Sequence, residues 1–398
     1  MKIRNCFTIR NISIASIFIV MVWWDAMEQI FPKCQFAILT LIFLIYVLKY
    51  RKFVFSKTIV ALSLIVIIHG IINILLGNDS VELFGVQILS IVLCVLIFNT
   101  IFKDTPMSEI MNLYYYFSVI VSIYGIIKFA SCLTKGQLER MTSFFSEPSF
   151  FAYFLMPVVA YIIISTLDKS MKDEKSCINN HKWVNVLVIC SFLLSFSTIA
   201  YLGIVLTLLI LWIKQGINAK KILFIVGAII VVYAAYSAIP DIRLRIDDTI
   251  KIFDSTDKYS ANFSTYTLYN NFNVTKEALK DTFAFGSGLG SYRNMFDRHS
   301  LGFGMSDLYN LNREDGNSML LRLSTELGFL GIVVLFFFIK KYYLKEKKLY
   351  SGYSCALLVL IILFLVRQGN YTHGCSIAIW CLYYKVWKEF NTKKKMLM

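Results

Sequence analysis

The chain has 398 residues, of which 57% are hydrophobic and 16% charged, and its formal net charge is +15. A soluble globular domain carries about 25% charged residues, so this composition excludes an ordinary soluble domain. Apolar runs of about 20 residues recur along the chain, which is the length needed to cross the hydrocarbon core of a bilayer. Because these runs lack the alternation of a membrane barrel, we predict an all-α integral membrane protein.

The positive charge is not distributed as in a nucleic-acid-binding protein. Lys and Arg form short clusters between the apolar runs, such as 49–52, 345–348 and 393–395, which is how orientation signals are placed in membrane proteins. The nine cysteines form no CxxC pair, and the four histidines show no metal-ligand spacing. We therefore expect a lipid bilayer as partner, no nucleic acid, and neither a metal nor another cofactor.

The apolar runs predict twelve membrane spans. The stretch 184–213 fits either one long tilted helix or two short helices joined near Ser197 and Thr198. Only two helices keep basic residues on the inner side at every turn of the chain, which favours twelve spans over eleven. The predicted spans are 11–31, 34–50, 58–76, 84–102, 108–131, 148–167, 184–197, 199–213, 221–239, 318–339, 352–367 and 373–388.

The basic residues also predict the orientation of the chain. With the N-terminus inside, 25 of the 40 Lys and Arg residues lie in inner segments, so we expect both termini in the cytoplasm. The chain then consists of nine spans (1–239), a large polar loop (240–317), and three spans with an inner tail (318–398). The alternation of basic residues along the spans places the large loop on the outer face. The loop's own basic residues do not contradict this, because long loops do not obey the charge rule.

The first polar motif precedes the sixth predicted span and runs from Arg140 to Pro148. Proline suits the first turn of a helix, and Ser146 or Glu147 would cap that helix. The N–H groups at such a helix start, with Arg140 beside them, would suit a phosphate. The alternative is that Glu147 serves only as a cap and Arg140 only as an anchor at the lipid headgroups.

The large loop begins with Arg243 and Arg245 and later contains a glycine-rich turn, Gly286 to Gly290, followed by Tyr292 and Arg293. The turn lacks the strand and helix context of a Walker loop or a dinucleotide fingerprint. Its glycines would permit the close approach of a ligand, or they form only a turn. We expect the arginines to be anion contacts.

Charged residues also mark the last third of the chain. Asp315 and Asn317 end the loop, and Arg322 and Glu326 are four residues apart, so they share one face of the tenth predicted span. A charge inside a span is costly and usually faces the protein interior or a water-filled cavity. This favours a functional pair over a purely structural one. Arg367 is either a further anion contact or a side chain that extends to the headgroups.

These residues resemble those of the bacterial O-antigen polymerase family, within the wider group of O-antigen polymerases and ligases. The resemblance covers the topology of the whole chain, with its many spans and one large late loop. The local matches are Arg140 through Glu147-Pro148-Ser149, the turn Gly286 to Tyr292, and Asn317 with Glu326 to Gly331. The family implies a GT-C-like glycosyltransferase in the bacterial inner membrane, with the large loop in the periplasm.

The family further implies metal-independent, inverting glycosyl transfer. The donor is a growing glycan on undecaprenyl diphosphate, and a hydroxyl of a second lipid-linked repeat unit attacks its anomeric carbon. A chain-length regulator is an expected protein partner. Candidates for deprotonating the hydroxyl are Glu147, Asp315 and, less favoured, Glu326. Diphosphate or glycan contacts are expected from Arg140, Arg243, Arg245, Tyr292, Arg293, Arg322 and Arg367.

Other functions remain open. Ligases of this group usually carry a histidine before the asparagine at the loop exit, where this chain reads Asp315-Gly316-Asn317. This favours a polymerase over an O-antigen ligase, and a capsule polymerase of the same family also fits. A flippase or transporter of lipid-linked oligosaccharides would need charges through the whole membrane, whereas the few intramembrane charges here are predicted near the outer face.

Overall fold

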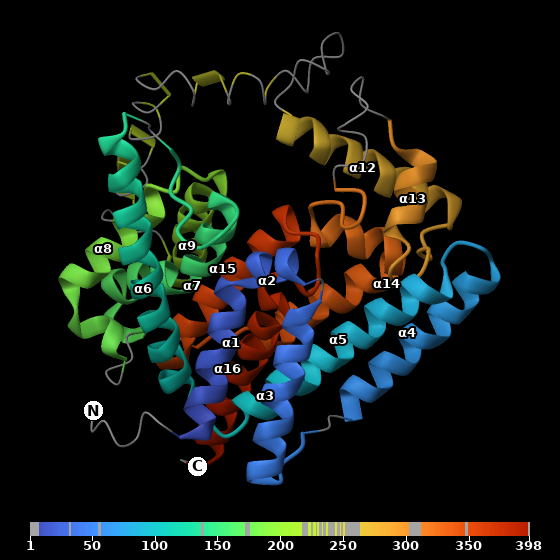
Figure 1. Ribbon diagram of the computed structural model, residues 1–398, viewed down its shortest axis with the longest axis horizontal. Helices are drawn as coiled ribbons and strands as arrows, with labels where there is room; N and C mark the ends of the chain where they lie inside the picture. The colour runs from blue at the N-terminus through green and yellow to red at the C-terminus, as the bar shows by residue number, and fades with distance from the viewer. Residues whose placement is uncertain are drawn as a thin grey trace.

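The computed structural model is helical, and the residues it describes contain no β-strand (Figure 1). It describes residues 8–396 except 32, 55–56, 137–138, 172–175, 217–221, 302–311, 347–348 and most of 224–262. The first helices are α1 (Ile9–Val22), α2 (Trp24–Ile30), α3 (Cys34–Tyr50), α4 (Lys57–Leu75), α5 (Val81–Phe102), α6 (Met107–Thr134), α7 (Pro148–Leu167), α8 (Lys182–Leu193) and α9 (Thr198–Gln215). Later helices are α12 (Phe263–Asp281), α13 (Tyr292–His299), α14 (Met319–Tyr342), α15 (Leu349–Arg367) and α16 (Ser376–Met396). Short 3₁₀ turns lie at Lys169–Met171, Cys177–Asn180 and His373–Cys375.

Six of the described helices are long and apolar enough to cross a membrane. They are α5, α6, α7, α9, α14 and the Tyr350–Arg367 part of α15. A seventh is added if α1 and α2 are counted as one broken span. The chain is therefore a multi-pass helical membrane protein. The ninth predicted span, 221–239, falls largely outside the described residues.

Two stretches of the chain are each divided into two helices, one against the prediction and one in agreement with it. The predicted span 11–31 is broken at Trp23, where the helix axis turns by 72° between α1 and α2. The acidic side chains of Asp25 and Glu28 follow this bend, and such groups are costly inside a hydrocarbon layer. The stretch 184–213 forms two helices, as predicted, and the chain turns between them at Phe196, which has a φ of 45°.

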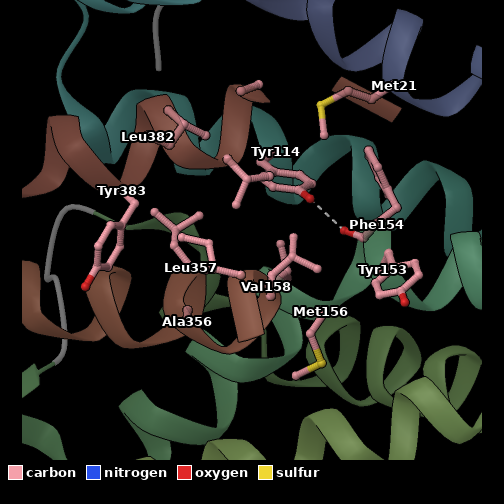
Figure 2. Packing of buried hydrophobic residues seen from close by; sticks show 14 of the residues in the cluster. Met21, Tyr114, Tyr153, Phe154, Met156, Val158, Ala356, Leu357, Leu382 and Tyr383 are labelled. Atoms are coloured by element: carbon pink, nitrogen blue, oxygen red, sulfur yellow. Dashed lines mark hydrogen bonds between the residues drawn. The ribbon is translucent and has the colours of Figure 1, made fainter. Parts of the chain in front are cut away.

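The centre of the bundle is formed by α7 and α15. In these two helices 78% and 83% of the apolar window is buried, against 22–33% in the other four candidate spans. Figure 2 shows their side chains packed together with those of α6 and α16, and the Tyr114 hydroxyl donates a 2.8 Å hydrogen bond to the Phe154 carbonyl. The outer helices expose apolar side chains such as Leu75 and Ile127, as a lipid-facing surface requires.

Polar contacts gather at two ends of the bundle. At one end, which we call the basic end, the start of α1 and the last turns of α16 meet the turn between α5 and α6. Arg10 donates to the Asp104 carbonyl (3.0 Å) and Lys385 to the Lys103 carbonyl (3.2 Å). Figure 1 shows α12 and α13 at the opposite end, which we call the loop end. Residues 140–147 and 367–373 belong to it through the contacts Ser146–Asp25, His373–Asp25 and Arg322–Gly369.

The two helices at the loop end have a small core of their own. It consists of Val274, Ala278, Tyr292, Met295 and Phe296, all of them fully buried. The first turns of α14 pack against both helices. The loop end is therefore a folded platform on the membrane bundle where the structure describes it.

Candidate functional site

The motif before α7 places two polar side chains at the loop end. Pro148 is the first residue of α7, as predicted, and Glu147 is its N-cap residue. Neither predicted cap forms a capping bond with its side chain, because Glu147 accepts from the Ser149 hydroxyl (2.8 Å) and the Ser146 hydroxyl donates to Asp25. Ser146 and Glu147 are both exposed, so Glu147 is a carboxylate that faces outward.

Arg367 contacts α7, the helix whose N-cap residue is Glu147, although the two residues are far apart in the sequence. Arg367 is the last residue of α15, and the Tyr153 hydroxyl of α7 donates to its carbonyl (2.9 Å). Arg367 is half-buried, and the charges of Glu147 and Tyr153 act on it electrostatically. The structure thus brings together one predicted anion contact and one predicted base.

An Asp–His pair that the sequence analysis did not select lies at the same end. His373 Nε2 is 2.7 Å from Asp25 Oδ1, and His373 Nδ1 is 3.2 Å from Gln368 Nε2. The Gln368 Oε1 atom accepts the Asn370 N–H (3.1 Å), so its amide nitrogen faces the imidazole. In this network Nδ1 accepts a hydrogen bond, and the Nε2–H group donates to Asp25.

A small cavity adjoins this pair. Its volume is about 30 Å³, which gives room for roughly two water molecules. The His373 ring packs 4.3 Å from the Phe150 ring, between ring centroids, and 6.0 Å from the Trp24 ring. The polar wall of the cavity is formed by Asp25, Gln368 and His373, and its aromatic wall by Trp24, Tyr114, Phe145, Phe150, Tyr153, Phe154 and Phe364.

Arg322 and Glu326 form a closed network instead of an open site. Arg322 Nε donates to Glu326 Oε1 (2.8 Å), and its other nitrogens donate to the Gln87 side chain (2.9 Å) and the Gly369 carbonyl (3.3 Å). Glu326 Oε2 accepts from the Tyr371 hydroxyl (2.9 Å), and Glu326 is 0% exposed. The geometry matches the structural alternative, an ion pair that joins α14 to α5 and to the 367–373 segment.

The glycine-rich turn contacts protein backbone in this structure. The Ser287 and Gly288 N–H groups donate to the carbonyls of Thr325 and Glu326, both at 2.9 Å. A Cβ atom on Gly290 would lie 2.9 Å from the Leu83 carbonyl oxygen. The glycines therefore permit close packing of the turn against α14 and the start of α5.

Tyr292 follows this turn directly in the sequence, and Asp315 lies at the exit of the large loop. Tyr292 is 0% exposed, and a Cβ atom on Gly316 would meet its ring, so the conformation offers no substrate access to the phenol. Burial raises the pKa of Tyr292, and the nearby Asp315 carboxylate adds to that shift. Asp315 is half-buried and its Oδ1 accepts the Asn317 N–H (3.0 Å), which holds the loop exit in a turn.

The remaining arginines occupy separate places. Arg140 lines a hollow of about 10 Å³ with Lys128 and Glu139, near the Tyr201 side chain of α9. Arg293 faces Glu314 at 3.3 Å, with 42% of its side chain exposed.

Arg243 lies 3.8 Å from Asp247, with 64% of its side chain exposed. Arg245 lies outside the described residues. Among the described residues, no group of three His, Cys, Asp or Glu side chains gathers as a metal site.

The sequence did not identify Asp25 and His373 as site residues, and the reason is physical. They are 348 residues apart, and neither belongs to a short motif with a recognisable spacing. The one signal available was that each is a polar residue beside an apolar run at the predicted outer face.

Family models and curated proteins give no relative for this chain. No model of a protein family matches it, and neither does any curated protein. A functional assignment therefore rests on the residues, their geometry and the motifs quoted above.

Proposed function

We propose that the chain is an O-antigen polymerase of the bacterial inner membrane, which joins undecaprenyl-diphosphate-linked repeat units by metal-independent, inverting glycosyl transfer. The observation that carries the proposal is the Asp25–His373 pair at one polar end of an apolar bundle, where Ser146, next to Glu147, and Gln368, next to Arg367, form hydrogen bonds with the pair. A cation and carboxylates are thereby held where the headgroup of a lipid-linked substrate would lie.

The chemistry requires two kinds of group. The leaving diphosphate gains negative charge as its bond to the anomeric carbon breaks, and a positioned guanidinium stabilises that charge. The attacking sugar hydroxyl must lose a proton, for which a nearby carboxylate is suited. Arg367 supplies the first kind of group, and Arg140 with Lys128 forms a second cationic position on the same side of the bundle.

The proposed topology has twelve spans, cytoplasmic termini and a periplasmic loop at 240–317. Support comes from the charge distribution, since the basic end carries Arg10, Lys52, Lys103, Lys385 and the Lys393–Lys395 run. Positive charge is retained on the cytoplasmic side of bacterial membrane proteins. This supports the proposal that the loop end faces the periplasm, where the lipid-linked repeat units are expected.

A flippase fits the buried charges less well. Among the described residues, the buried charged side chains are Asp79, Arg322 and Glu326. Arg322 and Glu326 bond to each other near the start of α14, and Asp79 lies in the turn between α4 and α5, so they do not line a path across the bilayer. An O-antigen ligase and a capsule polymerase of the same family remain the nearest alternative enzymes.

Purified protein tests the proposal directly. In a bilayer nanodisc, wild-type protein should convert undecaprenyl-diphosphate-linked units into longer glycans, with chelator present. Arg367→Ala should lower the rate by about 10²-fold or more. Arg367→Lys should recover only part of it, because lysine lacks the planar fork of arginine.

The matched control is Arg10→Ala at the basic end, which should leave the rate within about twofold. The absence of polymer from wild-type protein, or equal rates in the Arg367 and Arg10 variants, would contradict the proposal.

A further inference from the structure

Asp25 already binds a hydroxyl group at the loop end. Ser146 Oγ donates to Asp25 Oδ2, and the Ser146 side chain is exposed. The carboxylate thus presents one oxygen atom to a hydroxyl that comes from the solvent side. A sugar hydroxyl that replaced Ser146 would meet the same oxygen in the same way.

The other carboxylate oxygen is held rigidly. Asp25 Oδ1 lies 2.7 Å from His373 Nε2, and the Gln368 amide fixes the opposite nitrogen of the ring. The rings of Phe150 and Trp24 pack against the imidazole. His373 is therefore held in one tautomer and one orientation, with its N–H directed at Asp25.

The other carboxylates at this end are bound differently. Both oxygens of Glu326 accept bonds from buried partners, Arg322 and Tyr371. Asp315 accepts a hydrogen bond from the Asn317 N–H group within its own turn. Glu147 accepts a hydrogen bond from Ser149, two residues away at the start of the same helix. Among these four carboxylates, Asp25 is the one that is both oriented by a separate segment and hydrogen-bonded to an exposed hydroxyl.

Resting on the proposed function, we propose that Asp25 is the base that accepts the proton of the attacking sugar hydroxyl, with His373 as its positioning residue. The hydroxyl oxygen forms the new bond to the anomeric carbon while its proton moves to the Asp25 carboxylate. The bond from that carbon to the lipid diphosphate breaks, and its electron pair leaves with the diphosphate. The incoming sugar hydroxyl takes the position of the Ser146 hydroxyl and displaces it from Asp25.

The test compares rate with donor binding in purified protein. Asp25→Asn removes the base and keeps the shape, so the turnover rate should fall about 10²- to 10⁴-fold. Binding of the undecaprenyl-diphosphate-linked unit, measured by titration, should change by less than about threefold. Asp25→Ala should regain part of its rate when formate is added as a substitute carboxylate, whereas Arg367→Ala should gain nothing.

Two further variants separate the roles of the neighbours. His373→Gln keeps one hydrogen-bond donor and should lose less turnover than His373→Ala, with the donor affinity unchanged in both. Ser146→Ala keeps the carboxylate and removes only the hydroxyl that the substrate replaces, so its rate should equal or exceed that of the wild type.

A second Asp–His pair provides the matched control. His299 Nε2 lies 2.8 Å from Asp281 Oδ2 on α12 and α13, where the Asp281 side chain is 51% exposed. Asp281→Asn should leave turnover within about twofold.

The outcomes distinguish the two proposals. If wild-type protein makes no polymer, the proposed function fails and this inference with it. If wild-type protein polymerises and Asp25→Asn keeps more than about a third of its rate, only the assignment of Asp25 is wrong. Loss of donor binding in a folded Asp25→Asn variant, or a 10²-fold loss in Ser146→Ala, would likewise overturn it.

Discussion

Gly286 and Gly328 lie backbone against backbone at the loop end. A Cβ atom on Gly286 would come 2.5 Å from the Gly328 nitrogen, and one on Gly328 would come 2.7 Å from the Gly286 nitrogen. Gly328 has φ 59° and ψ −152°, a conformation that is essentially restricted to glycine. This contact explains why α14 is broken at Gly328 and why the turn that packs there begins with glycine.

Alanine at this contact should destabilise the protein. Gly328→Ala introduces both a strained backbone conformation, which costs about 1–3 kcal/mol, and an overlap with the turn at Gly286. We expect a clear fall in the thermal unfolding midpoint in detergent. Gly85→Ala is the control, because its Cβ atom would have open space in α5. That variant should be neutral or slightly stabilised, since alanine favours a helix over glycine.

The buried ion pair should behave as a unit. Replacing only one partner, as in Arg322→Met or Glu326→Gln, leaves a buried group without its counterpart and should cost about 3–5 kcal/mol. The double variant should cost much less than the sum of the two single variants. Unfolding measurements in a double-mutant cycle give the coupling directly.

The exposed pair Arg293–Glu314 is the comparison for this cycle, and its coupling should lie within about 1 kcal/mol. Additive losses for Arg322 and Glu326 would mean that the two side chains do not form a pair in the membrane-embedded protein.

Helix positions were largely predictable from local sequence. The predicted spans 34–50 and 148–167 correspond to α3 and α7, because an apolar run of the right length is bounded by charge or by Pro148. The split between α8 and α9 was also predicted from the alternation of basic residues. These features depend on residues close together in the chain, and pattern analysis detects such features well.

The site was predictable only in part, because its contacts are nonlocal. The sequence placed Arg322 and Glu326 on one helix face, but the closure of that pair depends on Gln87 and Tyr371 from other helices. The Asp25–His373 pair depends on a helix bend and on a segment at the far end of the chain. No local spacing encodes either contact.

Asp79 should make stability depend on pH. It is 7% exposed, its Oδ1 accepts the Ser80 N–H (2.8 Å), and its Oδ2 has no hydrogen-bond partner. Burial raises the pKa of Asp79 to about 7, the Ser80 N–H opposes the shift, and the Glu326 charge adds to it. An unfolded aspartate has a pKa of about 3.9, so the folded state retains a proton that the unfolded state loses.

The free energy of unfolding should therefore decrease as pH rises from about 4 to about 7 and level off above that. The slope for one retained proton is about 1.4 kcal/mol per pH unit at most. Asp79→Asn stays neutral and should lack this decrease, so its advantage over wild type grows between pH 5 and pH 7. Thermal unfolding across that range checks it; parallel curves for wild type and Asp79→Asn would refute the role of Asp79.

Deletion of the protein from its host distinguishes the three proposed classes of function. Loss of a polymerase should leave single repeat units attached to the lipopolysaccharide core, with no ladder above them, because units still cross the membrane and are still ligated. Loss of a ligase would leave bare core and polymer on the lipid carrier. Loss of a flippase would leave the units on the cytoplasmic face. We expect the first pattern, since the proposed periplasmic position of Arg367 and Glu147 suits transfer between units that have already crossed. Complementation with Arg367→Ala should fail to restore the ladder, whereas Arg10→Ala should restore it. Bare core in the deletion strain would exclude a polymerase.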